Sequence, residues 1–184
     1  MLKNLTMQKI TPFLWFDKEA QEAAKFYSSV FKGKITSKSI MNDTPSGEIG
    51  TSSGTVEIYN VEIHGLEFTL MSAGPLFKIN PSISFHVKCP TIEEVDALWK
   101  KLSEKGEVLM ELGKYPFNER YGWCNDKYGV SWQIIHTPKE QIKQKIVPIL
   151  MFVGKVCGKA KEAIHFYTSL FKNSKIGSLT SLGR

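Results

Sequence analysis

The sequence predicts an α+β fold made of two tandem βαβββ modules, followed by the beginning of a third module. Three observations support this fold class. Over residues 9–136 the order strand, helix, three strands occurs twice in the pattern of apolar residues. The segment KFYSSVFK at residues 25–32 recurs as HFYTSLFK at 165–172, and ITPFLWF at 10–16 recurs as IVPILMF at 146–152. Because such a repeat marks the structural unit of a fold, the chain divides into modules that follow this repeat.

The first module is predicted over residues 9–79 and begins with a strand at 10–16. Asp17 is expected to cap the next segment, whose apolar residues recur at helical spacing. Gly33 ends this predicted helix, and a short strand follows it. The module therefore opens with strand, helix and strand.

The first module continues with a predicted hairpin formed by residues 55–63 and 66–72. The dipeptide His64–Gly65 between them favours a tight turn. The alternation of apolar residues slips at Tyr59–Asn60, which suggests a β-bulge there. Asn42–Gly54, before the hairpin, is rich in turn-forming residues, so we expect a mobile loop that could act as a lid.

The second module is predicted over residues 80–136. A strictly alternating strand at 82–88 precedes TIEE at 91–94, a capping box that begins a helix ending at Gly106. Three further strands complete the module, at 107–112, 119–125 and 130–136, and the turn DKYG joins the last two.

We therefore predict three parts of the chain: a complete domain at 1–138, a polar linker at 139–145 and the truncated start of a second domain at 146–184. The third part repeats the strand and the helix, and SKIGS at 174–178 answers the second strand of the first module. A strand and a helix cannot bury their apolar sides alone, so we expect a homodimer formed through residues 146–184.

Composition excludes several classes of protein. The 184 residues, 42% hydrophobic and 23% charged, have an ordinary globular composition. The longest apolar run, IVPILMFV, is far shorter than the roughly 20 residues that span a bilayer, so we expect no membrane partner and a cytoplasmic location. The net charge of +6 is spread along the chain, so we expect no nucleic-acid partner. The three cysteines lie far apart, which argues against a disulfide framework or a zinc knuckle.

Three sequence pieces resemble the glyoxalase/bleomycin-resistance/extradiol-dioxygenase superfamily, also called the vicinal oxygen chelate superfamily. They are TPFLWFD at 11–17, KFY..VF at 25–31 and RYGW..D.YGVSWQI at 120–134. Within the superfamily they are most similar to the PhnB-like branch, whose members often carry the label demethylubiquinone methyltransferase. The resemblance implies a cup-shaped domain. It does not imply one reaction, because this fold serves isomerases, dioxygenases, fosfomycin-modifying transferases and drug-binding proteins.

The methyltransferase label can be tested against the residues. A Rossmann-type methyltransferase or dinucleotide enzyme has a glycine-rich turn between a strand and the following helix. Neither FDKEAQEAAKF at 16–26 nor HVKCPTIEEVD at 86–96 contains such a turn. We therefore expect no cofactor of this kind.

The resemblance implies that a divalent metal, where present, is held by four side chains. Each module supplies two of them, one from its first strand and one from its last strand. Strand phase assigns these positions to Thr11, Thr69, Ser82 and Gln133. Three hydroxyls and one amide offer no charge to compensate for dehydration of the ion, so we expect no metal. His86 lies on the same predicted face and could act as a base or a single ligand, although a lone strand histidine is more often a hydrogen-bonded lining residue.

The side chains on this predicted face form the candidate ligand pocket: Thr11, Phe13, Trp15, Thr69, Met71, Ser82, Ser84, His86, Tyr121, Trp123 and Gln133. Aromatic rings with a few hydrogen-bonding groups are typical of small-molecule sites, although such rings could equally fill a core. We predict a metal-independent small-molecule-binding protein. The alternative is a superfamily enzyme, an isomerase, group transferase or dioxygenase-like protein, that uses His86 or Glu67 as acid, base or metal ligand.

Overall fold

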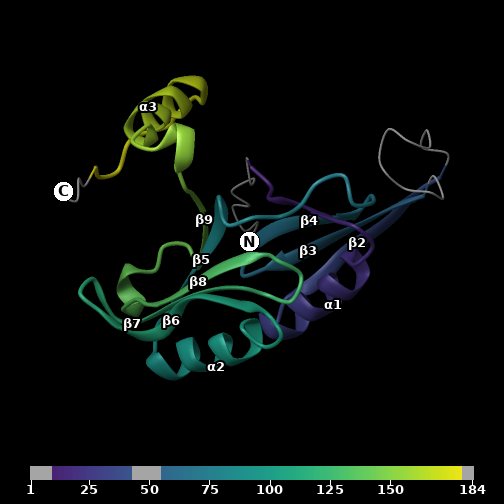
Figure 1. Cartoon of the computed structure of the whole chain (residues 1–184), viewed down its shortest axis with the longest axis horizontal. Coiled ribbons are helices and arrows are strands. Elements are labelled where there is room, and N and C mark those ends of the chain that lie inside the picture. Colours follow the sequence, from purple (N-terminus) through teal and green to yellow (C-terminus); the bar gives the residue numbers. More distant parts are fainter. Residues whose placement is uncertain (1–9, 43–54, 180–184) are drawn as a thin grey trace, which may run out of the picture. The chain divides into compact units, whose positions relative to one another are not determined.

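A computed structural model of the chain describes residues 10–42 and 55–179. The described residues form two compact units, divided between Ile149 and Leu150. The first unit contains two sheets, each with one helix, in the order of two βαβββ modules (Figure 1). The predicted α+β fold class is therefore confirmed. The predicted lid, Asn42–Gly54, lies outside the described residues except for Asn42, and the predicted domain boundaries stay a prediction.

Sheet A belongs to the first module and has the strand order β1-β4-β3-β2. Its strands are β1 (Phe13–Phe16), β2 (Lys34–Met41), β3 (Val56–Ile63) and β4 (Leu66–Ser72). β1 runs parallel to β4, and the other neighbours are antiparallel. The helix α1 (Ala20–Val30) packs against β3 and β4, and the opposite face of the sheet, against which no described helix of the first unit packs, is called its open face.

Sheet B belongs to the second module and has the order β6-β7-β8-β5-β9. Its strands are β5 (Ile83–Cys89), β6 (Glu107–Tyr115), β7 (Asn118–Asn125), β8 (Ser131–His136) and β9 (Ile146–Leu150). The helix α2 (Ile92–Leu102) packs against β7 and β8, and it also contacts α1. Figure 1 shows both helices on one side of the two sheets. A 3-10 turn, η1 (Lys139–Gln141), lies in the connection to β9.

The helix-facing sides of both sheets share one core. Phe68 of β4 contacts Phe85 of β5, with ring centroids 5.0 Å apart. The ring centroid of Trp132 on β8 likewise lies 5.0 Å from that of Phe31, which follows α1. Asp126 in the β7–β8 turn is 3% exposed and accepts hydrogen bonds from the Tyr27 hydroxyl and the Trp132 indole N–H, each 2.8 Å long. A buried polar group needs such partners, so this carboxylate joins the first module to the second.

The N-cap predicted for α2 is confirmed by the structure, whereas the N-cap predicted for α1 is not. Thr91 caps α2, because its hydroxyl accepts a 3.2 Å hydrogen bond from the Glu94 backbone N–H, as the capping box predicts. The predicted cap of α1 by Asp17 is wrong. Glu19 occupies the N-cap position without a side-chain cap, and the Ala20 N–H instead donates to the Ser72 hydroxyl at 3.0 Å. A partner distant in sequence replaced the local cap.

Two further predictions need correction. The bulge predicted at Tyr59–Asn60 lies instead on β2, where the register with β3 shifts between Ile35 and Ser37, while β3 pairs with β4 without a break. The strand predicted at 174–178 is wrong, because these residues adopt no regular structure. In the first module the equivalent strand β2 is paired with β3, and the chain from 171 to 179 has no such neighbour among the described residues.

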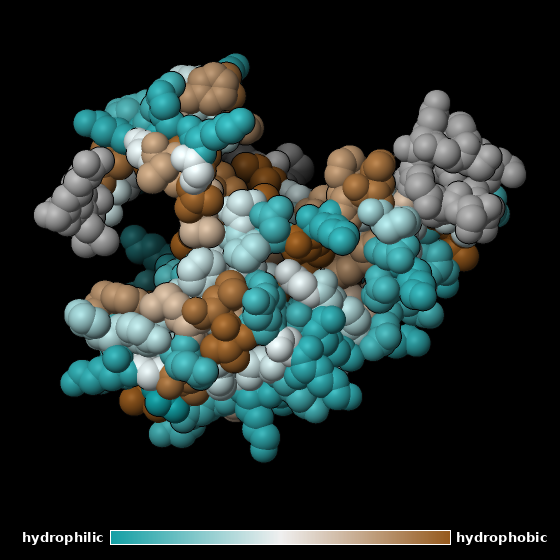
Figure 2. Space-filling model, viewed as in Figure 1, coloured by the Kyte–Doolittle hydropathy of each residue, from teal (hydrophilic) through white to brown (hydrophobic). Residues whose placement is uncertain are grey.

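The second unit contains a 3-10 turn, η2 (Gly154–Val156), and the helix α3 (Ala160–Leu170). α3 repeats α1, yet its large apolar residues Phe166, Tyr167 and Leu170 are exposed. Tyr167 and Phe171 are 42% and 50% exposed, whereas their counterparts Tyr27 and Phe31 are 1% and 2% exposed. Figure 2 shows apolar side chains at the surface of this unit beside hydrophilic ones. Among the described residues, no helix is both long and apolar enough to cross a membrane.

Candidate functional site on the open sheet faces

The open face of sheet B is the side away from α2. Neighbouring residues in register point to the same side of a sheet, so the strand pairing defines rows across this face. One row places His86 beside Gln133 and Trp123, and the next places Lys88 beside Ile135 and Tyr121. A third row places Ser84 beside Ser131 and Asn125. The register thus brings together five of the predicted pocket residues: Ser84, His86, Tyr121, Trp123 and Gln133.

A hydrogen-bond chain crosses these rows. The Tyr121 hydroxyl donates to Gln133 Oε1 at 2.7 Å, and Gln133 Nε2 donates to the Ser84 hydroxyl at 2.8 Å. In the same sheet the Trp123 indole N–H donates to the Ser131 hydroxyl at 2.8 Å. These bonds fix the orientation of the Gln133 amide, because both of its ends are engaged.

Aromatic rings stand beside this chain at the end of the β6–β7 hairpin. Tyr115 and Phe117 are stacked with ring centroids 5.5 Å apart and an interplanar angle of 21°, and both contact the edge or face of Tyr121. Phe117 is exposed, whereas Tyr121 is buried. The sequence prediction missed Tyr115 and Phe117. Their position two and four residues after Gly113, which pairs with Tyr121, is a signal only once the hairpin register is known.

His86 lies on β5, on the open face, is half-buried and has no hydrogen-bond partner among the described residues. Burial and, to a smaller extent, the positive charge of Lys88 together lower the pKa of His86 to about 4. The imidazole is therefore neutral at pH 7 and offers one donor and one acceptor. This differs from the hydrogen-bonded lining role that is usual for a lone strand histidine.

The open face of sheet A carries four further predicted residues, Phe13, Trp15, Thr69 and Met71. Phe13 pairs with Thr69 and Trp15 pairs with Met71. The Thr69 hydroxyl donates to Asn60 Oδ1 at 2.8 Å, and Asn60 Nδ2 donates to the Ser37 hydroxyl at 3.0 Å, so an amide again links neighbouring strands.

Three more sequence-predicted residues lie at or beyond strand ends. Glu67 lies on β4, two residues before Thr69, and Thr11 precedes β1. Ser82 precedes β5, is exposed, and donates its backbone N–H to Asn80 Oδ1 at 3.0 Å. The hydrogen bonds of Thr69 and Gln133 stay within their own sheets, so the convergence of Thr11, Thr69, Ser82 and Gln133 stays a prediction.

The residues at the predicted metal positions do not fit a divalent ion. Thr69 donates its hydroxyl proton to Asn60, and the Gln133 amide is engaged at both ends. Within the described part of the chain, no three His, Cys, Asp or Glu side chains are grouped so that they could hold a metal. Divalent ions in proteins need several carboxylate, imidazole or thiolate ligands, and here His86 is the one imidazole on this face of sheet B.

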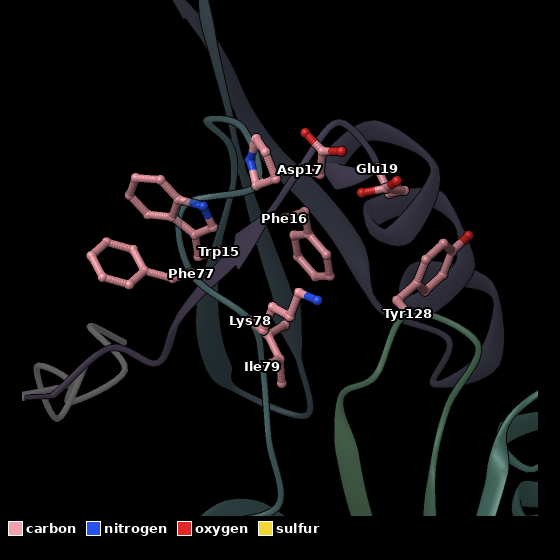
Figure 3. Close-up of a pocket in the computed structure, with 9 residues that line it drawn as sticks. Trp15, Phe16, Asp17, Glu19, Phe77, Lys78, Ile79 and Tyr128 are labelled. Atoms are coloured by element: carbon pink, nitrogen blue, oxygen red, sulfur yellow. The ribbon is translucent and has the colours of Figure 1, made fainter. Parts of the chain in front are cut away.

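A hollow lies at the junction of the modules and has a volume of about 300 Å³ (Figure 3). It is formed by the end of β1, the start of α1, the connection from β4 to β5 and the β7–β8 turn. Its lining shares only Trp15 with the predicted pocket and consists of Trp15, Phe16, Asp17, Glu19, Pro75, Phe77, Lys78, Ile79 and Tyr128. Figure 3 shows Asp17 and Glu19 on one side of this hollow and Lys78 on the other.

The tandem βαβββ modules, with one open face on each sheet, define a protein of the glyoxalase type. Residues 8–135 and again 144–184 match the family described as 3-demethylubiquinone-9 3-methyltransferase. The chain belongs to this family, which is the PhnB-like branch of the vicinal oxygen chelate superfamily. No curated protein matches the chain significantly.

Solved structures are also similar to the chain. The chain is 41% identical to the PhnB protein from Bacillus cereus, with a TM-score of 0.61 over 71% of this chain and 100% of that one. It is also similar to the protein PA1353 from Pseudomonas aeruginosa, at 19% identity and a TM-score of 0.56 over 72% of this chain and 100% of that one.

A third similar structure is a variant of the fosfomycin resistance protein FosX from Listeria monocytogenes, complexed with Mn(II) and 1S,2S-dihydroxypropylphosphonic acid. It is 15% identical, with a TM-score of 0.51 over 76% of this chain and 100% of that one. At these identities PA1353 and FosX show the fold alone.

Proposed function

We propose that this chain is a metal-independent small-molecule-binding protein whose ligand lies on the open face of sheet B. The observation that carries the proposal is the hydrogen-bond chain Tyr121–Gln133–Ser84 beside the unpaired, neutral His86. Ligand sites are typically apolar surfaces with a small number of fixed polar groups. The stacked rings of Tyr115 and Phe117 supply the apolar part here.

The ligand chemistry follows from these groups. His86 is half-buried with its hydrogen-bonding capacity unused by the described residues, and a bound molecule that donates or accepts there replaces water at that position. The exposed Phe117 and half-buried Tyr115 favour a planar, partly aromatic body, because stacked rings gain contact area and a defined geometry. The proposed ligand is therefore a neutral, partly aromatic molecule with one or two hydrogen-bonding groups.

The alternative function is catalysis by the same face, as an isomerase, a group transferase or a dioxygenase-like enzyme, with His86 or Glu67 as acid or base. A catalytic base works best when its pKa lies near the working pH. The pKa of His86, about 4, makes the imidazole a weak base at pH 7. This value favours a binding role for His86 over a role in proton abstraction.

A thermal-shift screen of a compound library, run with a chelator present, tests the proposal. A ligand that binds only the folded state at about 100 times its Kd stabilises that state by roughly 2.7 kcal/mol, which raises the melting temperature. We expect hits whose shift is lost in His86→Gln and in Phe117→Ala. The shift should be kept in two controls away from the open face, His165→Gln on α3 and Val108→Ala on β6. Hits that stabilise all four variants equally contradict the proposed site.

We also propose that two copies of the chain associate through residues 146–184. The proposed location of the protein is the cytoplasm. The support for association is the repeat: Leu170 is 58% exposed, whereas its counterpart Val30 is 8% exposed. Each large apolar side chain that becomes buried contributes about 1.5–3 kcal/mol, so pairing of two such helices is favourable.

Sedimentation of the full chain tests this association. Leu170→Glu places a charge on the exposed apolar side of α3 and should yield a monomer at low micromolar concentration. The matched control Lys161→Glu changes the charge on another exposed position of α3 and should leave the dimer intact. A dimer that survives Leu170→Glu, or a wild-type chain that sediments as a monomer, overturns the proposed interface.

A further inference from the structure

The hollow at the module junction carries charges of both signs that do not pair with one another. Asp17 and Glu19 stand on one side and Lys78 on the other (Figure 3). None of the three forms an ion pair with any described residue. Glu19 accepts one hydrogen bond, at 2.9 Å, from the backbone N–H of Lys18. The hollow therefore separates two anionic groups from a cationic one.

Aromatic rings line the hollow, and two of them, Trp15 and Tyr128, are fixed by hydrogen bonds, whereas Phe77 is exposed. The Trp15 indole N–H donates to the Gly74 carbonyl at 2.7 Å, and its ring meets Phe77 edge-on with centroids 5.0 Å apart. On the far side the Tyr128 hydroxyl donates to Glu22 Oε1 at 2.7 Å. Rigid aromatic walls can hold an apolar body with little loss of side-chain entropy.

The size of the hollow limits the ligand. Its volume of about 300 Å³ lies at the lower end of the range for small-molecule pockets. A molecule the size of one amino acid fits this space.

We propose that the module-junction hollow binds a small zwitterion: an amino acid with an apolar or aromatic side chain, or a molecule with the same pattern of charges. Its ammonium group lies beside Asp17 and Glu19, its carboxylate beside Lys78, and its side chain against Trp15 and Phe77. The two opposite charges of the zwitterion, both carried by the α-carbon of an amino acid, can meet the anionic and the cationic side of the hollow at once, which an anion or a cation alone does not. This site is separate from the open face of sheet B and does not depend on the proposed function.

An NMR titration of the full, isotope-labelled chain tests this proposal, with the indole N–H of Trp15 as the reporter. The three probes are L-phenylalanine, 2-phenylethylamine, which lacks the carboxylate, and 3-phenylpropionate, which lacks the ammonium. We expect a saturable shift with L-phenylalanine at a Kd of about 1 mM, and binding about two- to fivefold weaker with each single-charge probe.

The variants assign the charges. Lys78→Gln should weaken L-phenylalanine and leave 2-phenylethylamine unchanged, whereas Asp17→Asn should weaken L-phenylalanine and leave 3-phenylpropionate unchanged. Lys25→Gln, an exposed position on α1 outside the hollow, is the control and should change nothing. The proposal is overturned if no probe shifts Trp15, if a single-charge probe binds as tightly as L-phenylalanine, or if both pocket variants bind all probes like the wild type.

Discussion

Protonation of His86 should lower the free energy of unfolding, so the folded chain should become less stable at low pH. Its pKa is about 4 in the folded chain, against an ordinary value of 6.5, and burial is the main cause. The unfolded chain binds the proton more readily than the folded chain. The stability that the neutral, buried imidazole contributes is therefore complete above pH 6.5 and is lost as the pH falls toward 4. Lowering the pH from about 7.5 to 4.5 should therefore remove about 2.5 kcal/mol of stability through this residue alone.

Urea denaturation at the two pH values measures this loss, and a variant isolates it. His86→Gln lacks the titrating group, so its loss of stability between the two pH values should be smaller than that of the wild type by about 2.5 kcal/mol. His64, whose pKa is also lowered by burial, is present in both proteins and cancels. His165→Gln on the exposed helix α3 is the control and should behave like the wild type. Equal pH dependence of the wild type and His86→Gln would refute the buried, neutral imidazole.

Three further changes test the packing that supports the site. Asp126→Asn should destabilise the chain by about 3 kcal/mol in urea denaturation at pH 7. The reason is that a buried carboxylate that accepts four hydrogen bonds is replaced by an amide with one acceptor oxygen. A loss of stability below about 1 kcal/mol would contradict the role of Asp126 as a link between the modules. Gly122→Ala should lower the melting temperature and cost about 2 kcal/mol, because the new Cβ would lie 2.5 Å from the Trp99 ring, and a neutral effect would mean that the ring moves freely. Thr91→Ala should cost about 1 kcal/mol through loss of the α2 cap, whereas Thr91→Ser should keep most of the stability.

The fold was predictable because burial follows the period of each element. In β5, Phe85 and Val87 are buried while His86 is half-buried, so the sequence alternation matches the pleat. In α1, Ala20, Ala23 and Tyr27 recur on one side and are all buried. The module order could therefore be predicted from local patterns and the repeat alone.

What could not be predicted depends on contacts between distant residues. The Ser72 hydroxyl satisfies the first N–H of α1, so the local capping signal at Asp17 had no role. The aromatic pair Tyr115 and Phe117 reaches Tyr121 only through the register of a hairpin with several irregularities. The junction hollow needs three segments far apart in the sequence, and no local pattern brings them together.

A crystal structure of the full chain with the best hit from the chelator-treated screen tests the central claim most directly. The account predicts that the ligand lies on the open face of sheet B, within hydrogen-bonding distance of His86 or Gln133 and with its ring against Phe117. It also predicts no metal ion between ligand and protein. A ligand bound only elsewhere, or one held on this face through a divalent ion, would contradict the claim.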